Sequence, residues 1–260
     1  ALRLKSELDW HKERDRRLRE ELNLARRVQE AVLPGAASED GVCVQAYFRA
    51  SEELAGDLYA WHRRGERRWA FAVIDAMGHG ISSSLVSMFV ASVLKEAMQS
   101  LWAPERVFRE INRRLSGLRP ENELVQYYCT GIYATLDLKA GRLEYANAGH
   151  PPGLLYHADG GKPERLAASS APLGMFDSLP LSSVGLAIRP GDRLYLYTDG
   201  ILGSMEGESG NQIDQLAEIL RPAAGDAERA AELVERAPLD GRSDDRCLIR
   251  IEIGHREVEG

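Results

Sequence analysis

The chain has 260 residues, of which 44% are hydrophobic and 28% are charged, and its formal net charge is −7 at pH 7. This length and composition are typical of one soluble globular domain with an appendage. The negative charge argues against a broad nucleic-acid-binding surface, and no continuous apolar run approaches the roughly 18 residues that span a bilayer. No signal-peptide pattern opens the chain. We therefore expect a cytoplasmic protein that binds neither nucleic acid nor membranes.

Residues 1–33 are rich in arginine, glutamate and leucine and contain no glycine or proline. Every third or fourth residue follows an imperfect heptad pattern that polar residues interrupt. This seam consists of Leu4, Leu8, His11, Asp15, Leu18, Leu22, Ala25, Gln29 and Val32. One interpretation is a single amphipathic helix packed on its own domain. The interpretation we favour is a parallel two-helix coiled coil.

The coiled coil would join two copies into a homodimer. The residues expected to form the dimerisation and switch surface are Leu18, Leu22, Ala25 and Val32. Because the sequence starts without methionine inside a helical pattern, we expect a longer protein in which the helix transmits a signal from an upstream sensor domain.

From residue 41 onward the hydrophobic pattern changes to a period of two, which is typical of strands. Strands are expected at 42–49, 56–63, 68–75, 127–138, 141–149, 153–157, 165–168, 184–188, 193–200 and 246–253, and helices at 81–100, 104–118 and 211–237. Strand blocks with helices grouped between them predict an α+β layered sandwich. The three cysteines are far apart, each in a strand-like stretch, which favours reduced buried thiols over a disulfide or zinc site.

Four aspartates lie at or beside the ends of strand-like segments, and two of them directly adjoin glycine. They are Asp57, Asp75, Asp199 and Asp244. Carboxylates without accompanying thiolates or paired histidines favour hard cations such as Mg²⁺ or Mn²⁺. Several carboxylates gathered in one place would repel one another unless a metal neutralised them. Any one of these motifs alone is more typical of a turn, but their common placement indicates a shared metal site.

Five motifs occur in a familiar order: "AGDLYAW", "DAMGHG", "NAGHPP", "LYTDG" and "DDRCLI". In this order they resemble the RsbU/SpoIIE-type serine phosphatases, a bacterial branch of the metal-dependent PPM (type 2C) protein phosphatases. The resemblance covers roughly residues 20–253 and includes the helix "LNLARRVQEAVLPG". It implies an αββα sandwich of two antiparallel sheets flanked by helices. The implied domains are a linker helix at 1–33 and a phosphatase domain at 40–254.

The resemblance also implies a binuclear metal site. Asp75 corresponds to the carboxylate that bridges both metals, with the carbonyl of Ala76 as a neighbouring ligand. Asp57 corresponds to a ligand of one metal, and Asp199 with Asp244 to the pair that completes the other metal's shell.

Two assignments within the motifs have alternatives. Asp245 directly follows Asp244 and is the other candidate for the last ligand. His79 would position phosphate or protonate the leaving serine oxygen; the alternative is a turn histidine that bonds the backbone. His150 is expected to shape the turn before two prolines.

Together these features predict a protein serine/threonine phosphatase that uses two divalent cations, Mn²⁺ or Mg²⁺. The expected catalytic residues are Asp57, Asp75 and His79. A metal-bridging hydroxide would attack phosphorus directly, without a covalent phosphoenzyme. By resemblance, the substrate is a phosphorylated STAS-domain anti-anti-sigma factor in a partner-switching pathway.

Two alternative functions remain. The first is a catalytically weak or inactive module of the same fold that binds a phosphoprotein, which the retention of all four aspartates disfavours. The second is a metal-dependent nuclease, which the net charge disfavours. Departures from the family pattern at Ala60, Gly203 and Ser209 leave substrate contacts and the active–inactive switch open.

Overall fold

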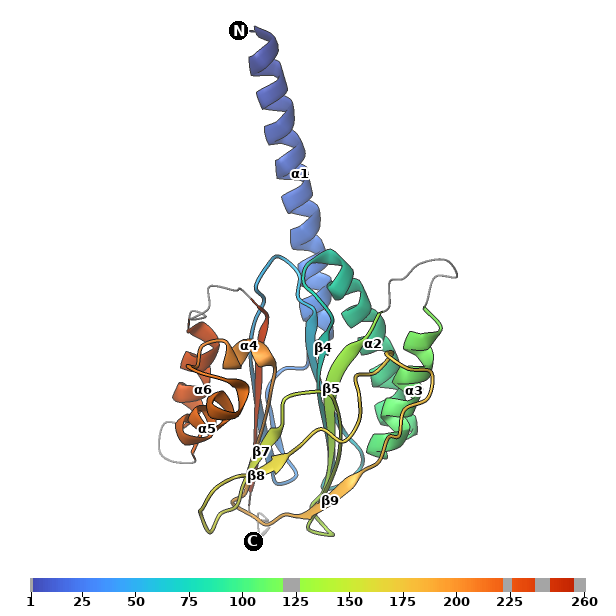
Figure 1. Cartoon of the computed structure of the whole chain (residues 1–260), viewed down its shortest axis with the longest axis vertical. Helices are drawn as coiled ribbons and strands as arrows, with labels where there is room; N and C mark the ends of the chain where they lie inside the picture. Colours follow the sequence, from blue (N-terminus) through green and yellow to red (C-terminus); the bar gives the residue numbers. More distant parts are fainter. Residues whose placement is uncertain (1, 119–126, 222–225, 237–243, 255–260) are drawn as a thin grey trace.

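The computed structural model describes residues 2–118, 127–221, 226–236 and 244–254. Two β-sheets lie face to face between two layers of helices, and a long N-terminal helix extends from one end (Figure 1). Every strand pair in both sheets is antiparallel among the described residues. The αββα sandwich predicted from the sequence is confirmed.

One sheet has six strands, in the order β1 (Ala37–Glu39), β2 (Val42–Arg49), β11 (Arg246–Ile253), β10 (Arg193–Tyr197), β7 (Gly153–Tyr156) and β8 (Glu164–Leu166). The other has five, in the order β3 (Asp57–Arg63), β4 (Arg68–Ala76), β5 (Cys129–Asp137), β6 (Arg142–Ala148) and β9 (Val184–Ala187). Helices α2 (Ile81–Ser100) and α3 (Pro104–Ser116) cover the five-stranded sheet, while α4 (Asp199–Leu202), α5 (Ser209–Ile219) and α6 (Asp226–Glu235) cover the six-stranded sheet.

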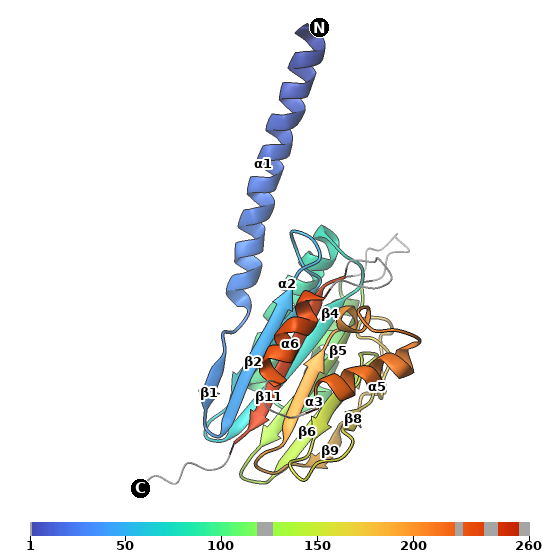
Figure 2. The same ribbon diagram turned by 90° about the vertical axis from the view of Figure 1, so that its left-hand side faces the viewer.

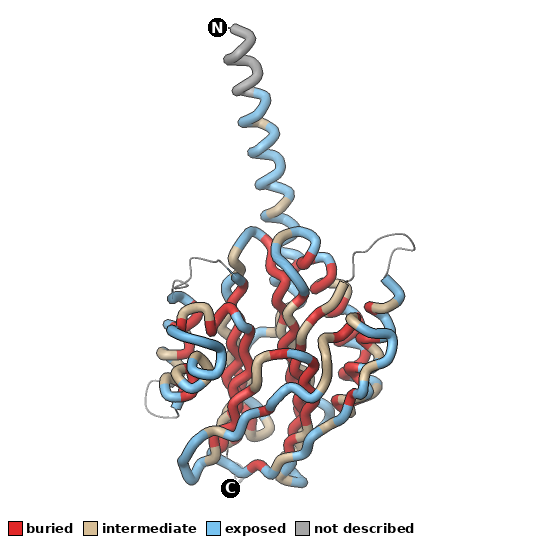
Figure 3. Tube along the Cα trace, in the orientation of Figure 1, coloured by how far each residue is buried: buried red, intermediate tan, exposed pale blue. Residues whose placement is uncertain are grey.

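The interior strand β4 shows why the sandwich forms. Its alternate residues Trp69, Phe71 and Val73 pack between the sheets, whereas Ala72 and Ile74 pack under α2 and α3. A strand that is buried on both faces reads as a nearly continuous apolar run. Figure 3 shows the same pattern for the whole molecule, with buried residues concentrated in the two sheets and exposed ones along the N-terminal helix.

Helix α2 is both long and rich in apolar residues. It is the one helix in the described part of the chain whose length and mean hydropathy, 1.3, suit a membrane span. The inner face of α2, including Val90, Leu94 and Met98, is buried in the core over the five-stranded sheet. The core helix of a sandwich meets the same criterion of length and apolar content, so the length and apolar content of α2 do not by themselves indicate a membrane span.

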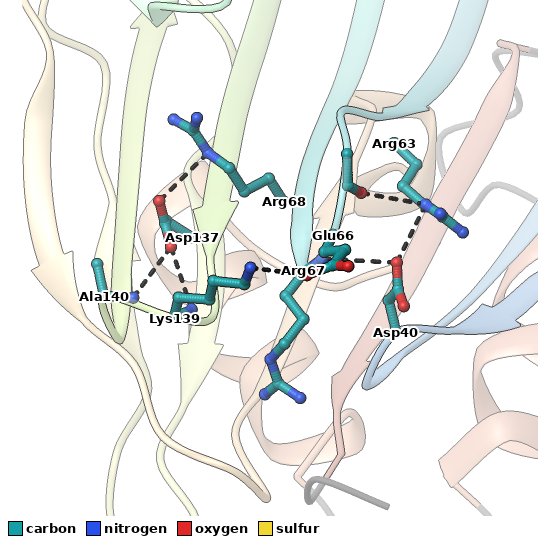
Figure 4. A network of polar contacts seen from close by, with 9 residues as sticks. Asp40, Arg63, Glu66, Arg67, Arg68, Asp137, Lys139 and Ala140 are labelled. Atoms are coloured by element: carbon teal, nitrogen blue, oxygen red, sulfur yellow. Dashed lines mark hydrogen bonds and ion pairs between the residues drawn. The ribbon is translucent and has the colours of Figure 1, made fainter.

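Charged side chains gather at the β3–β4 hairpin, at the opposite end of these strands from Asp57 and Asp75. Figure 4 shows Lys139 contacting Glu66 at 2.9 Å and Arg68 contacting Asp137 at 3.2 Å. Most of these side chains are well exposed, and exposed pairs contribute at most about 1 kcal/mol each. The network therefore joins two hairpin ends without being a strong source of stability.

Helix α1 (Leu2–Val32) meets the rest of the molecule only near its C-terminal end (Figure 2). Gln29 is 6% exposed and packs on its own domain, so its placement in a seam facing a second copy was wrong. Leu18 and Val32 are about half exposed, at 50% and 49%. The side chains of Leu4 and Leu8 lie outside the part of the chain that the structure describes.

The largest differences from the sequence prediction are in three places. The expected helix at 211–237 is two helices, α5 and α6, and its residues 222–225 and 237 lie outside the described residues. The three-residue strand β1 was not predicted. Asp199 is the first residue of the short helix α4, where the sequence indicated the end of a strand.

Candidate functional site

Four elements bring the predicted aspartates to one end of the sandwich. Asp57 begins β3 and is the direct antiparallel partner of Asp75 near the end of β4. Asp199 follows β10 by two residues, and Asp244 precedes β11 by two. Since β10 and β11 are paired neighbours in the facing sheet, the sandwich places the two pairs of carboxylates opposite each other.

The turn after Asp75 is shaped by glycine. Gly78 and Gly80 have φ angles of 81° and 82°, a region that residues with a Cβ rarely adopt. This turn carries His79 outward, where its Nδ1 lies 2.8 Å from Oε1 of Glu52 and its side chain is 70% exposed. His79 therefore lies at the solvent side of the site and contacts an acidic partner.

The carboxylates raise one another's pKa. Burial, followed by the charges of Asp75 and Asp245, holds the pKa of Asp57 well above its usual value, although a hydrogen bond from Thr198 opposes this. Burial and then the charges of Asp199, Asp244 and Asp245 raise the pKa of Asp75 to about 8. Each ionised carboxylate makes ionisation of its neighbours less favourable, so a nearby positive charge would stabilise the ionised cluster.

The pKa values of the other two carboxylates, Asp199 and Asp244, are raised as well. Loss of solvent contact raises the pKa of both Asp199 and Asp244, and the Asp199 charge raises that of Asp244 further. No lysine or arginine of the described residues forms an ion pair with any of the four carboxylates. The positive charge that the cluster lacks is therefore not supplied by a basic side chain in this part of the chain.

Asp245 has a different role from Asp244. Its Oδ1 accepts a hydrogen bond from the amide of Ser51 at 2.7 Å, and its Oδ2 accepts one from the amide of Gly56 at 2.6 Å. Asp245 is 3% exposed, and both of its oxygens bind backbone. This geometry favours Asp244 over Asp245 as the aspartate available to an ion.

The oxygen atoms at the site suit a hard cation, although they do not form a finished coordination shell. Oδ2 of Asp57 is buried and has no hydrogen-bond partner, which is costly unless another group satisfies it. No group of three or more histidine, cysteine, aspartate or glutamate side chains among the described residues is arranged to hold an ion as it stands. An unpaired buried carboxylate oxygen amid other carboxylates fits a divalent cation that would draw them together.

His150 lies beneath the site and connects the sheets. Its Nε2 donates to the carbonyl of Tyr197 in β10 at 3.0 Å, so its Nδ1 accepts from Oγ1 of Thr130 in β5 at 2.8 Å. Burial lowers the pKa of His150 to about 3, because a charged ring would have to lose its hydration. Both nitrogens are occupied, which agrees with the structural role expected for this residue.

Sequence reasoning missed three residues that hold the site together: Gln29, Gly56 and Asp245 as a backbone anchor. Gln29 binds both backbone groups of Ala55, and a Cβ on Gly56 would lie 3.0 Å from the carbonyl oxygen of Ala76. A polar residue within an apolar seam was the one available signal for Gln29, and it was interpreted as a defect in a coiled coil.

The sequence matches known proteins over most of its length. Residues 65–254 match the family described as Stage II sporulation protein E (SpoIIE). The phosphoserine phosphatase RsbP of Bacillus subtilis is 39% identical over 182 residues, which are 70% of this chain and 45% of that protein. The phosphoserine phosphatase RsbU of the same organism is 25% identical over 189 residues, 71% of this chain and 54% of RsbU. The chain thus spans about half the length of these relatives.

The fold has solved counterparts as well. The SiaA-PP2C domain of Pseudomonas aeruginosa superposes with a TM-score of 0.77 at 20% identity, and covers 92% of this chain and 98% of that domain.

Proposed function

The chain belongs to the SpoIIE family, among the RsbU/SpoIIE-type PPM phosphatases, and from this premise we propose that it hydrolyses phosphoserine or phosphothreonine on a regulatory protein. One observation carries the proposal: Asp57 and Asp75 face each other across adjacent strands, with a buried Asp57 oxygen that lacks a partner. Such an arrangement is unfavourable in an apoprotein and useful to a metal-dependent enzyme.

The proposed ligands of two divalent cations, Mn²⁺ or Mg²⁺, come from all four strand ends. They are the carboxylates of Asp57, Asp75, Asp199 and Asp244 and the backbone carbonyl of Ala76. When bound, the cations would neutralise the carboxylates, activate water for direct attack on phosphorus and offset charge on the phosphoryl oxygens.

The chain's own groups would bind and orient the substrate around that chemistry. His79 is exposed beside the cluster, where it can hold a phosphate oxygen or give a proton to the leaving serine oxygen. Cysteine is an unsuitable nucleophile here, because burial raises the pKa of both Cys129 and Cys247. We therefore propose direct hydrolysis without a phosphoenzyme.

The substrate and partners are proposed from the family. The names of RsbP and RsbU identify them as phosphoserine phosphatases, and we propose a phosphorylated STAS-domain anti-anti-sigma factor as the substrate of this chain. Helix α1 would form a homodimer through its exposed leucines and connect the domain to an upstream sensor in a longer protein.

A second candidate is a phosphatase-fold module that binds a phosphoprotein with little or no catalysis. The observation that favours it is that, in the described residues, the carboxylates are not arranged as a ready metal site.

Hydrolysis of p-nitrophenyl phosphate separates the two functions. Measured with and without Mn²⁺, and again after chelation by EDTA, turnover by a phosphatase should require the metal and return when it is restored. A folded protein that shows no Mn²⁺-dependent turnover on this substrate or on a phosphoserine peptide would favour the binding module.

A further inference from the structure

A histidine and a glutamate form a pair at the solvent side of the carboxylate cluster. His79 belongs to the turn that follows Asp75, and Glu52 belongs to the segment 51–57 that leads into β3. Nδ1 of His79 lies 2.8 Å from Oε1 of Glu52. Within the described part of the chain, Glu52 is the one ion-pairing partner of His79. Neither residue is among the proposed ligands of the ions, so the pair needs another explanation.

The backbone that carries this pair is held in place on both sides. Asp245, which is 3% exposed, accepts hydrogen bonds from the amides of Ser51 and Gly56 at 2.7 Å and 2.6 Å. The amide of Ala76 donates to the carbonyl oxygen of Gly56 at 3.3 Å, which joins the segment to the turn. The backbones that carry Glu52 and its partner are therefore fixed relative to each other, and the remaining freedom is in the two side chains.

The carboxylate of Glu52 lies close to the turn as well as to the ring. A Cβ added to Gly80, the residue after His79, would lie 3.2 Å from Oε2 of Glu52. Gly80 has a φ of 82°, a conformation that favours glycine and leaves space for the carboxylate. The contact with Glu52 thus restricts the rotation of an imidazole that is 70% exposed and would otherwise turn freely.

This contact decides which nitrogen of His79 is left for the substrate. An ionised carboxylate only accepts hydrogen bonds, so Nδ1 carries a hydrogen and donates it to Glu52. Nε2 is therefore the nitrogen that is available at the site. A carboxylate that orients a histidine through Nδ1 is a general arrangement for a ring whose other nitrogen transfers a proton.

The ring of His79 is also close to the cluster in electrostatic terms. Burial comes first among the causes that raise the pKa of Asp244, and the charge of Asp199 follows, whereas the charge of His79 acts in the opposite direction. The leaving oxygen of a phosphoserine is bonded directly to phosphorus. A proton donor beside the cluster can therefore reach that oxygen while the phosphate lies over the carboxylates.

We propose that Glu52 is a positioning residue for His79, and that the pair delivers the proton that the leaving serine oxygen needs. This inference rests on the proposed phosphatase activity. When the bond between phosphorus and serine Oγ breaks, its electron pair stays on Oγ, and the proton on Nε2 of His79 forms the new O–H bond. Water supplies the OH group that phosphorus gains and releases one proton to solvent, from which the exposed ring regains its own. Nδ1 keeps its hydrogen bond with Glu52 throughout.

The test uses two substrates that differ in their leaving oxygen. A serine alkoxide is a poor leaving group that needs a proton, whereas p-nitrophenolate is stable without one. The measured quantity is the turnover of a phosphoserine peptide divided by the turnover of p-nitrophenyl phosphate, both at saturating Mn²⁺. Glu52→Ala should lower this ratio about 10-fold, a part of the roughly 10²–10⁴-fold that proton transfer contributes.

Glu53→Ala is the matched control for Glu52→Ala. Glu53 is the neighbouring glutamate and is also exposed, but it forms no ion pair with His79. The control should keep the wild-type ratio, and circular dichroism establishes that each variant is folded.

A double variant shows whether Glu52 acts through His79. His79→Asn should lower the ratio by at least about 100-fold. Addition of Glu52→Ala should lower it no further, because a positioning residue has no effect once the group that it positions is gone.

Nuclear magnetic resonance of the ring nitrogens gives a readout that does not depend on activity. In metal-free protein, at a pH where the ring is neutral, His79 should carry its hydrogen on Nδ1 in the wild type and in Glu53→Ala. Glu52→Ala should shift the hydrogen toward Nε2, since the acceptor for Nδ1 is removed.

Equal ratios in the wild type and Glu52→Ala, or an unchanged position of the ring hydrogen, would overturn the proposal. Additive losses in the double variant would overturn it too, because Glu52 would then act independently of His79. If His79→Asn lowers turnover of both substrates equally, the ring binds phosphate and gives no proton, which also overturns it. If the wild type shows no Mn²⁺-dependent turnover, the proposed function fails, while the resonance result still decides whether Glu52 fixes the ring.

Discussion

Asp57 and Asp75 meet at the centre of the site, and their environment sets its properties. Burial comes first among the causes that raise the pKa of each, and repulsion from the other carboxylates follows. An ionised carboxylate in that position costs folding free energy until a cation binds. The function and the stability of the domain should therefore respond to the same ion.

Asp75→Asn should raise the melting temperature of the metal-free protein at pH 8, because it removes one charge from a repelling cluster. It should also abolish the increase in melting temperature that Mn²⁺ gives the wild type, since ligand binding to the folded state is what stabilises it. Thermal denaturation with EDTA and with Mn²⁺ measures both effects.

Asp159→Asn is the control for this experiment, because Asp159 is 73% exposed in a surface turn. It should change neither quantity. An Asp75→Asn protein that is still stabilised by Mn²⁺ as strongly as the wild type would contradict the ligand assignment.

His150 should make the stability of the folded protein depend on pH, in a direction that follows from its pKa. Its pKa is lowered from 6.5 to about 3, so below pH 6.5 the unfolded chain binds a proton that the folded protein does not. Stability from this residue is therefore complete above pH 6.5 and is lost as the pH falls toward 3.

His150→Gln should remove this pH-dependent contribution to the free energy of unfolding. Between pH 6 and 4 the wild type should lose roughly 1.4 kcal/mol per pH unit more than the variant, which corresponds to one proton. Urea denaturation in EDTA across this range measures the difference, in which the shared contribution of the aspartates cancels. Parallel curves for the two proteins would show that His150 is not held neutral.

At the scale of elements, the close approach of β3, β4 and α2 fixes the site. Gly56 lies where these three meet, and an added methyl group would be 3.0 Å from the carbonyl oxygen of Ala76. Because that neighbour is backbone, it cannot turn aside as a flexible side chain would. A Cβ at this position would require the backbone at Ala76 to shift by a few tenths of an ångström.

Gly56→Ala should lower the free energy of unfolding by about 1–3 kcal/mol, the usual range for overpacking, and weaken Mn²⁺ binding. Gly210→Ala is the matched control, since its Cβ would meet nothing within 4 Å and alanine favours the helix α5. Denaturation and Mn²⁺ titration of both variants provide the measurement. If Gly56→Ala behaves like Gly210→Ala, the packing argument is wrong.

The elements that the sequence predicted well are those with long, regular patterns. The bounds of α2 and β11 match, because uninterrupted apolar periodicity and flanking turns define both. The three residues of β1 are too few for a period, and its pairing with β2 depends on tertiary contact. The start of α4 at Asp199 was not predicted, because "LYLYTDG" continues a strand pattern into the turn.

In the candidate site, too, only the residues that belong to a local sequence pattern were predicted. The aspartates at strand ends, two of them next to glycine, were visible in the sequence, and the structure brings them to one end of the sandwich. The backbone contacts of Gln29 and Asp245 were not visible, since they join positions separated by 26 and 189 residues. No local pattern encodes such contacts.

At the scale of the whole molecule, α1 extends away from the sandwich and contacts it only near the C-terminal end of the helix. Gln29 faces the domain, so a seam between two copies can use only the exposed side chains along the helix. Leu18 is 50% exposed and Leu22 is partly buried, and both belong to the predicted heptad pattern. Leu24, at 65% exposed, lies outside that pattern.

Leu18→Asp combined with Leu22→Asp should weaken self-association and change phosphatase activity, because charges in the seam oppose the pairing of helices. Leu24→Asp should leave both unchanged. Sedimentation and kinetics on the same samples measure the two properties together. A double variant that becomes monomeric with unaltered activity would make α1 a tether, and one that stays dimeric would refute the coiled coil.

The proposed function depends on the carboxylate cluster as the centre of a metal-dependent phosphatase. Its most direct test is the turnover of a phosphoserine peptide at saturating Mn²⁺ by the wild type, Asp75→Asn and Asp199→Asn. Each variant should remain folded and lose at least about 100-fold in turnover, since the charge stabilisation that its carboxylate provides through the metal is removed. Wild-type turnover in either folded variant would contradict the central claim.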